Sequence, residues 1–80
     1  MSESKGLLYP EKWLSRASTG VRVACELRMR IISGLIESGT ILSANKLAAE
    51  FSVSRSPIRE ALKILASEKI IRLERMGAVV

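Results

Sequence analysis

The feature that most constrains this fold is a pair of short helical patterns, joined by a tight turn, within residues 47–65. The first pattern places Leu47, Ala48 and Phe51 on one helix face. The second carries an apolar stripe at positions i, i+3, i+4 and i+7, formed by Ile58, Ala61, Leu62 and Leu65. With apolar residues pointing inward from both helices, the sequence predicts a helix-turn-helix.

Local signals indicate where these two helices begin. Ser43 precedes the first helix and can cap it, and Ser52 with Val53 forms the turn. Ser54 can cap the second helix because its side-chain oxygen can accept a hydrogen bond from a free backbone N–H. Pro57 falls in the first turn of that helix, where a missing N–H costs nothing.

Three cations stand one turn apart along the exposed side of the second helix: Arg55, Arg59 and Lys63. A solvated charged face is the ordinary explanation of such a row. Here, however, the row begins at the N-terminal end of the helix, directly after a short turn, and Glu60 is the only anion near it. Recognition helices present their N-terminal residues to base edges, and the planar fork of arginine matches O6 and N7 of guanine. The row therefore favours binding to double-stranded DNA.

A longer helix is expected before this unit, from about residue 20 to residue 38, with Gly39 just after its end. Its core face is formed by residues at helical spacing, namely Ala24, Leu27, Ile31, Gly34 and Leu35. A ladder of alternating charge on its exposed side indicates a solvated surface and consists of Arg22, Glu26 and Arg30.

The same helix carries a second apolar strip, formed by Cys25, Met29, Ile32 and Ile36. A helix wetted on that side would not need these residues, so either residues 7–14 or a partner missing from this chain should cover them. Residues 7–14 bring Leu, Tyr and Trp together, which is typical of an anchor on this domain or of a docking segment for another domain or subunit. Ser18 or Thr19, in the linker that follows, can cap the helix.

The C-terminal part of the sequence predicts a β-hairpin. Residues 40–42 are a short extended piece that could pair with it. Residues 70–73 form one strand, residues 74–77 the turn and residues 78–80 the returning strand. Arg75 and Gly77 at the tip suit a minor groove or a line of phosphates, although an ordinary hairpin turn with an exposed arginine would look the same.

These residues together carry a family resemblance. The matching positions in the helix-turn-helix are residues 47–48, Phe51, residues 53–55, Pro57, residues 59–62 and Leu65. Those outside it are Arg28, Ile31, Gly34, Gly39, Leu42, Ser43 and residues 77–80. Over about residues 21–80 the chain resembles the GntR family of bacterial transcription regulators.

The resemblance implies a mostly α fold with a small β wing, a winged helix-turn-helix of three helices plus a β-hairpin at residues 19–80, after an N-terminal segment at residues 1–18. It implies DNA contacts from Ser43, Asn45, Lys46, Ser54, Arg55, Ser56, Pro57, Arg59, Lys63, Arg75 and Gly77. Within the family, the chain is similar to a metabolite-responsive repressor of a sugar-acid operon.

Membership would also imply a larger C-terminal helical domain that binds the metabolite effector and dimerises. Because the chain stops at its last strand, we expect that domain to be absent from it. A single recognition helix reads only a few base pairs, so we expect the full-length protein to bind a pseudo-palindromic operator as a homodimer.

Composition narrows the function classes. With 13 Lys and Arg against 8 Asp and Glu, the net charge of +5 favours an anionic partner. The chain has no His and a single Cys, so we expect no catalysis, no metal and no cofactor. The sequence shows neither the pattern of a signal peptide nor an apolar run long enough to span a membrane. We therefore expect a cytoplasmic protein without membrane contact.

Two other functions compete with DNA binding. A winged helix can serve as a protein-interaction module without base-specific DNA contacts, because a fold alone does not fix function. Aromatic or aliphatic residues on the recognition face would favour that alternative, and the face here is polar. A membrane-surface helix would have a uniformly basic polar face, whereas the longer helix alternates in sign.

Overall fold

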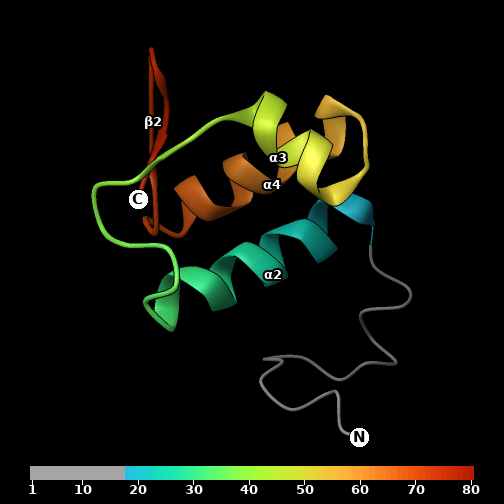
Figure 1. Cartoon of the computed structure of the whole chain (residues 1–80). Coiled ribbons are helices and arrows are strands. Elements are labelled where there is room, and N and C mark those ends of the chain that lie inside the picture. Colours follow the sequence, from blue (N-terminus) through green and yellow to red (C-terminus); the bar gives the residue numbers. More distant parts are fainter. Residues whose placement is uncertain (1–17) are drawn as a thin grey trace, which may run out of the picture.

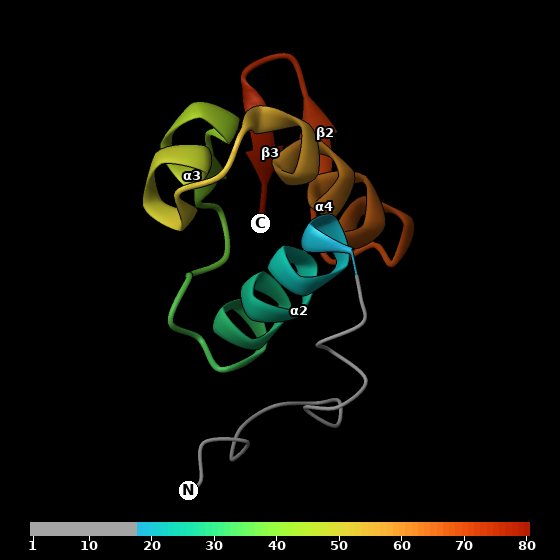
Figure 2. The same cartoon turned by 90° about the vertical axis from the view of Figure 1, so that its right-hand side faces the viewer.

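The computed structural model describes residues 18–80, which form three helices packed against a small sheet (Figure 1). The elements in chain order are α2 (Thr19–Ile32), β1 (Ile41–Leu42), α3 (Ala44–Phe51), α4 (Arg55–Ser67), β2 (Arg72–Glu74) and β3 (Gly77–Val79). Seen from the side, the hairpin of β2 and β3 lies behind α4 (Figure 2). Helices α2 and α3 lie nearer the viewer than the hairpin does.

Helix α2 begins as predicted but ends six residues early. Ser18 caps it by accepting a hydrogen bond from the Val21 N–H at 3.2 Å. The predicted end at residue 38 is wrong because Gly34 adopts a φ of 86°, and its N–H donates to the Ile31 carbonyl at 3.1 Å. A left-handed glycine after the last turn stops a helix.

The early end corrects part of the predicted core face. Ala24 and Leu27 are buried and Ile31 packs against the core, as expected. Gly34 lies in the exposed turn and Leu35 is 75% exposed, so their placement in the core was wrong. Both residues fall beyond Ile32, where the helical periodicity used for the prediction no longer applies.

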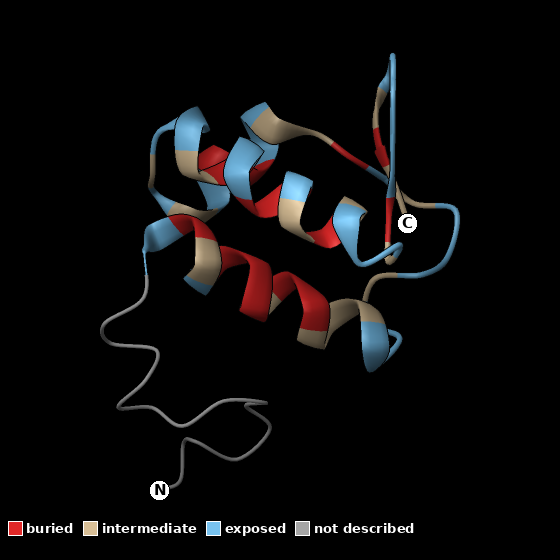
Figure 3. Ribbon diagram, turned by 180° about the vertical axis from the view of Figure 1, so that it is seen from behind, coloured by how far each residue is buried: buried red, intermediate tan, exposed pale blue. Residues whose placement is uncertain are grey.

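The core lies between α2 and α4, which run side by side in the same direction. Ser18, before the start of α2, contacts Glu60, and Arg28, further along α2, contacts Glu68 at the end of α4. Because both contacts follow the same order along the two helices, the helices are parallel. Buried residues of the two helices face each other (Figure 3). The largest fully buried side chains are Leu27, Ile58 and Leu65. The core is completed by Val23, Ala24, Leu42, Leu47, Ala48, Ala61, Leu62, Ile71 and Ala78.

The second apolar strip of α2 proves to be shorter than predicted. Cys25 is already buried, and Ile36 lies in the loop after the helix, where it packs against the core. Met29 is half-buried and Ile32 is 66% exposed. The expected cover, residues 7–14, lies outside the described residues.

The wing, the hairpin of β2 and β3, is joined by β1 in a three-stranded antiparallel sheet of order β1-β3-β2. Residues 40–42 pair with the hairpin as anticipated: Leu42 is opposite Ala78 on β3, and Leu73 of β2 is opposite the same residue. The strand predicted at residues 70–73 starts only at Arg72, because Lys69 takes a φ of 63° and Ile71 turns into the core. The sheet thereby joins the long loop after α2 to the C-terminal strand.

Two leucines of the same segment test this account of the core. Leu27 is 0% exposed and Leu35 is 75% exposed. Leu27→Ala should lower the free energy of unfolding by about 2–5 kcal/mol, because it leaves a cavity between α2 and α4. Leu35→Ala should change it by less than about 0.5 kcal/mol. Urea unfolding followed by circular dichroism measures both, and equal losses would contradict the position at which α2 ends.

Candidate nucleic-acid interface

The helix-turn-helix is formed by α3, α4 and the three residues between them. Ser43 caps α3 as predicted, accepting a hydrogen bond from the Lys46 N–H at 3.3 Å. Ser52 reverses the chain with a φ of 57°, and the Val53 N–H donates to the Ala48 carbonyl at 3.0 Å. Ser54 is the N-cap of α4, but its hydroxyl makes no capping hydrogen bond, so that predicted bond is wrong.

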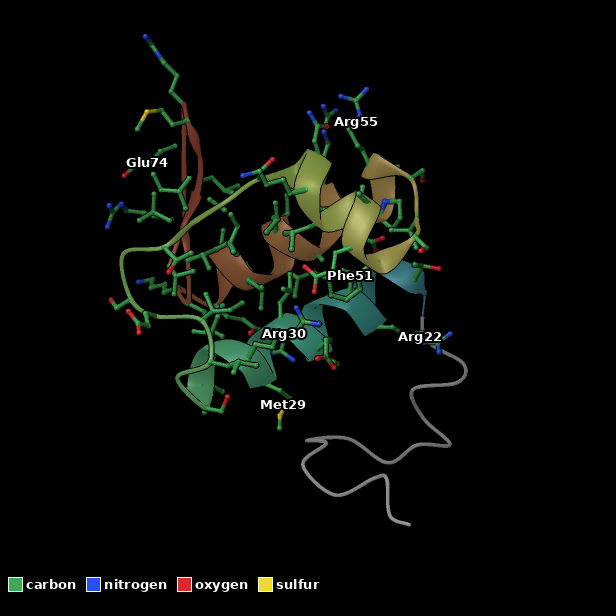
Figure 4. All side chains as sticks on the ribbon, viewed as in Figure 1. Arg22, Met29, Arg30, Phe51, Arg55 and Glu74 are labelled. Carbon is green, nitrogen blue, oxygen red and sulfur yellow. The ribbon has the colours of Figure 1, made fainter. Side chains whose placement is uncertain are left out.

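The predicted cationic row is exposed along α4. Arg55, Arg59 and Lys63 all lie on the surface, while the opposite side of the helix is buried against α2. They line a shallow open groove together with Ser54, Ser56, Glu60, Ile64 and Ser67. Arg55 points away from the body of the domain on the side toward which the hairpin tip also projects (Figure 4). Three cations on one open surface make the groove a candidate site for an extended anion.

A contact between side chains joins the starts of the two helices. Nη1 of Arg55 donates to Oδ1 of Asn45 on α3 at 3.5 Å, and both residues are exposed. Lys46, beside Asn45, is exposed as well. The structure thus brings the predicted contacts of α3 next to the cationic row.

The remaining predicted site residues fall into two groups. Ser43 and Pro57 are half-buried, and the Ser43 hydroxyl is engaged in capping α3. Arg75 is exposed in the turn between β2 and β3, and Gly77 begins β3. All of the predicted positions therefore lie on α3, α4, the segments before them or the wing.

Gly77 is required by the geometry of the wing. Its φ is 138°, in the region that favours glycine, and a Cβ there would lie 2.8 Å from the Leu42 carbonyl oxygen of β1. The missing side chain lets β1 and β3 approach closely. Gly77 thereby holds the turn that carries Arg75.

A buried arginine fixes the far end of the recognition helix. The side chain of Arg28 is 9% exposed, and it binds Glu68 through two parallel hydrogen bonds, Nε to Oε1 at 2.9 Å and Nη2 to Oε2 at 2.8 Å. Glu68 is the C-cap of α4, so this pair joins α2 to the junction between α4 and the wing. The pair was not predicted from the sequence. The available signal was that Arg28 occupies the i+4 position of the stripe that begins at Ala24.

A second arginine of α2 holds α3. Nη1 of Arg30 donates to Oε2 of Glu50 at 2.7 Å, Nε donates to Glu26 at 3.0 Å, and the guanidinium lies 5.2 Å from the centroid of the Phe51 ring (Figure 4). The hydrogen bond to Glu50, and to a lesser extent the one to Glu26, raises the pKa of Arg30 above its ordinary value. The predicted ladder is therefore more than a solvated surface, because Arg30 links α2 to α3.

Among residues 18–80, no helix has the length and apolarity needed to cross a membrane. The same part of the chain contains no group of three or more His, Cys, Asp or Glu side chains placed to hold a metal ion.

Comparison with known proteins places this geometry in a family. Residues 19–80 match the model described as bacterial regulatory proteins, gntR family. The gluconate operon transcriptional repressor of Bacillus licheniformis is 96% identical over 80 residues, which cover 100% of this chain and 33% of that protein. The repressor of the same name from Bacillus subtilis (strain 168) is 86% identical, with the same coverage of 100% and 33%. The chain thus spans about a third of the length of these curated relatives.

A solved structure agrees with the sequence relatives. The crystal structure of a transcriptional regulator from Pseudomonas syringae pv. tomato str. DC3000, a GntR family member, matches with a TM-score of 0.73 at 39% identity. The match covers 96% of this chain and 32% of that one. The predicted winged helix-turn-helix and the resemblance to a repressor of a sugar-acid operon are confirmed by these comparisons.

Two neighbouring substitutions test the role of Gly77. Gly77→Ala should destabilise the wing by about 1–3 kcal/mol, because it forces a side chain into a left-handed backbone against Leu42. Met76→Ala, in the same turn with the side chain 75% exposed, should have little effect. Hydrogen exchange of the β3 amides measures local opening, and equal exchange rates in the two variants would contradict the steric argument.

Proposed function

The chain belongs to the gntR family of bacterial regulatory proteins, and from this membership we propose that it is the sequence-specific DNA-binding domain of a gluconate operon repressor. The observation that carries the proposal is the exposed row of Arg55, Arg59 and Lys63 on α4. The two Bacillus relatives are gluconate operon repressors, and the operon is proposed from them. The polar recognition face favours DNA over a protein partner, which would be better served by apolar residues.

Within this proposal the cations divide into two roles. Arg55 and Arg59 read base edges in the major groove, because the arginine fork can bond two acceptors of guanine at once. Lys46, Lys63 and Arg75 bind phosphates and set the position of the domain on the duplex. The wing lies along the neighbouring backbone or enters the minor groove. Ser54 and Ser56, exposed beside Arg55, are placed to donate to phosphates or bases.

The assembly is proposed from the small size of the footprint. One recognition helix covers only a few base pairs, so the repressor binds as a homodimer to a pseudo-palindromic operator in the cytoplasm. The half-sites lie one helical turn apart, about 34 Å, or a multiple of it. The chain spans about a third of the length of the two Bacillus relatives, and in this proposal the dimer contacts and the metabolite site lie outside it. Linking two modules in this way raises affinity without any new contact to DNA.

The first test is the salt dependence of binding to duplex DNA. If Lys46, Lys63 and Arg75 neutralise three phosphates, log K should fall with log salt with a slope of about −2.7, since each phosphate contributes about −0.9. Fluorescence anisotropy over a salt series measures the slope. Arg22→Ala serves as a control, because Arg22 is an exposed cation on α2 and points away from Arg55 (Figure 4). A flat salt response, or tighter binding to single strands, would count against the proposal.

The second test separates base reading from phosphate binding. Arg59→Ala should cost about 1–3 kcal/mol on the specific site and relax the preference at one base position. Lys63→Ala should weaken specific and nonspecific duplexes by the same factor and reduce the salt slope by about 0.9. Binding to a randomised duplex library, followed by sequencing, reports the preference at each position. If both variants reduce specific and nonspecific binding equally, the division of roles is wrong.

A further inference from the structure

One carboxylate stands among the cations of the recognition helix. Glu60 is exposed and lines the same groove as Arg55, Arg59 and Lys63. A free carboxylate on this surface would repel phosphates and would lie within reach of Lys63, three residues further along the helix. The position of the Glu60 side chain therefore affects how much positive charge the groove presents.

The structure places the carboxylate of Glu60 against the first turn of α2. The Ser18 hydroxyl donates to Oε2 of Glu60 at 3.5 Å. The carboxylate also lies directly over Gly20, which is buried in the first turn of α2. A Cβ at position 20 would overlap Oε1 and would lie 2.8 Å from Cγ of Glu60. The side chain of Glu60 thus occupies the space that any other residue at position 20 would need.

The electrostatics of α2 favour the same position. The first turn of a helix carries free N–H groups and a partial positive charge, which stabilise a nearby anion. The first turn of α2 contains no acidic residue of its own. Glu60 therefore supplies from α4 the carboxylate that this helix end lacks.

We propose that Gly20 is a positioning residue for DNA binding: by leaving room above the first turn of α2, it keeps the Glu60 carboxylate off the DNA-facing row of α4. The inference rests on the proposed function of that row. Ser18 assists through its hydroxyl. In this arrangement Arg59 and Lys63 meet the duplex without a competing anion from their own helix.

The consequence of filling this space is specific. An alanine at position 20 expels the Glu60 carboxylate toward the groove, where it pairs with Lys63 at the i, i+3 spacing. Lys63 then has to give up that pair before it can bind a phosphate. The fold itself should tolerate the change, because alanine favours a helix over glycine and the displaced group is the flexible end of a long side chain.

The experiment is a double-mutant cycle of Gly20→Ala and Glu60→Gln in the full 80-residue chain. Gly20→Ala should weaken binding to a nonspecific duplex about fivefold and reduce the salt slope by up to about 0.9, the contribution of one phosphate contact. Glu60→Gln removes the charge, so Gly20→Ala added to it should change the affinity by less than about twofold, giving a strong coupling in the cycle. Thr19→Ala, an exposed change in the same turn, is the matched control and should leave binding unchanged.

Circular dichroism and thermal unfolding of each variant establish that α2 is retained. If Gly20→Ala weakens binding equally in the unaltered chain and in the chain that carries Glu60→Gln, the effect lies in α2 itself and the inference is overturned. No weakening at all would overturn it as well. The proposed function is judged separately, on the unaltered chain. If that chain shows no salt-dependent binding to duplex DNA, both the proposed function and this inference fail.

Discussion

The structure depends on the two-sided character of α4. One side buries Ile58, Ala61 and Leu65 completely against α2, and the other side exposes Arg55, Arg59 and Lys63. Because both sets repeat with the period of a single helix, burial of the first set fixes the direction in which the second set points. The hydrophobic core of this small domain is thereby also the part that orients its charged surface.

Two arginines of α2 connect this helix to the ends of α3 and α4. Arg28 holds Glu68 at the end of α4, and Arg30 holds Glu50 at the end of α3. Such pairs contribute little to stability where their carboxylates are exposed, with typical values of about 0–1 kcal/mol. Their effect lies in geometry: the two-point contact of Arg28 with Glu68 allows few relative orientations of α2 and the end of α4, and Arg30 adds a single hydrogen bond from α2 to Glu50. Helix α2 thus fixes the positions of α3, of α4 and of the wing that follows α4.

The charge of the surface is set by where the anions lie as well as by where the cations lie. Glu50 and Glu68 are bound to arginines of α2, and Glu74 is bound to Arg72 at 2.6 Å. Glu60 lies over the first turn of α2 beside Ser18. The cations of the row on α4 are in this way left to an external anion.

The sequence by itself determined the helix-turn-helix, the exposed row on α4 and the cap at Ser43. Each of these depends on a local rule of periodicity, capping or backbone conformation, and local rules are written in neighbouring residues. The family resemblance added the winged form of the fold and the class of transcription regulators. The end of α2 was misjudged because two glycines, Gly34 and Gly39, both take positive φ, and the first one already stops the helix.

Only the tertiary structure decided which charged residues serve the fold and which are left for a partner. Arg28 and Arg55 are both arginines in helical patterns, yet one is buried against Glu68 and the other is exposed beside Asn45. The contact between Glu60 and Gly20 joins positions 40 residues apart, and no periodicity relates them. Such pairings arise when α2 and α4 pack side by side in one direction. Their register is set by the shape of the shared core, which the sequence of either helix alone does not contain.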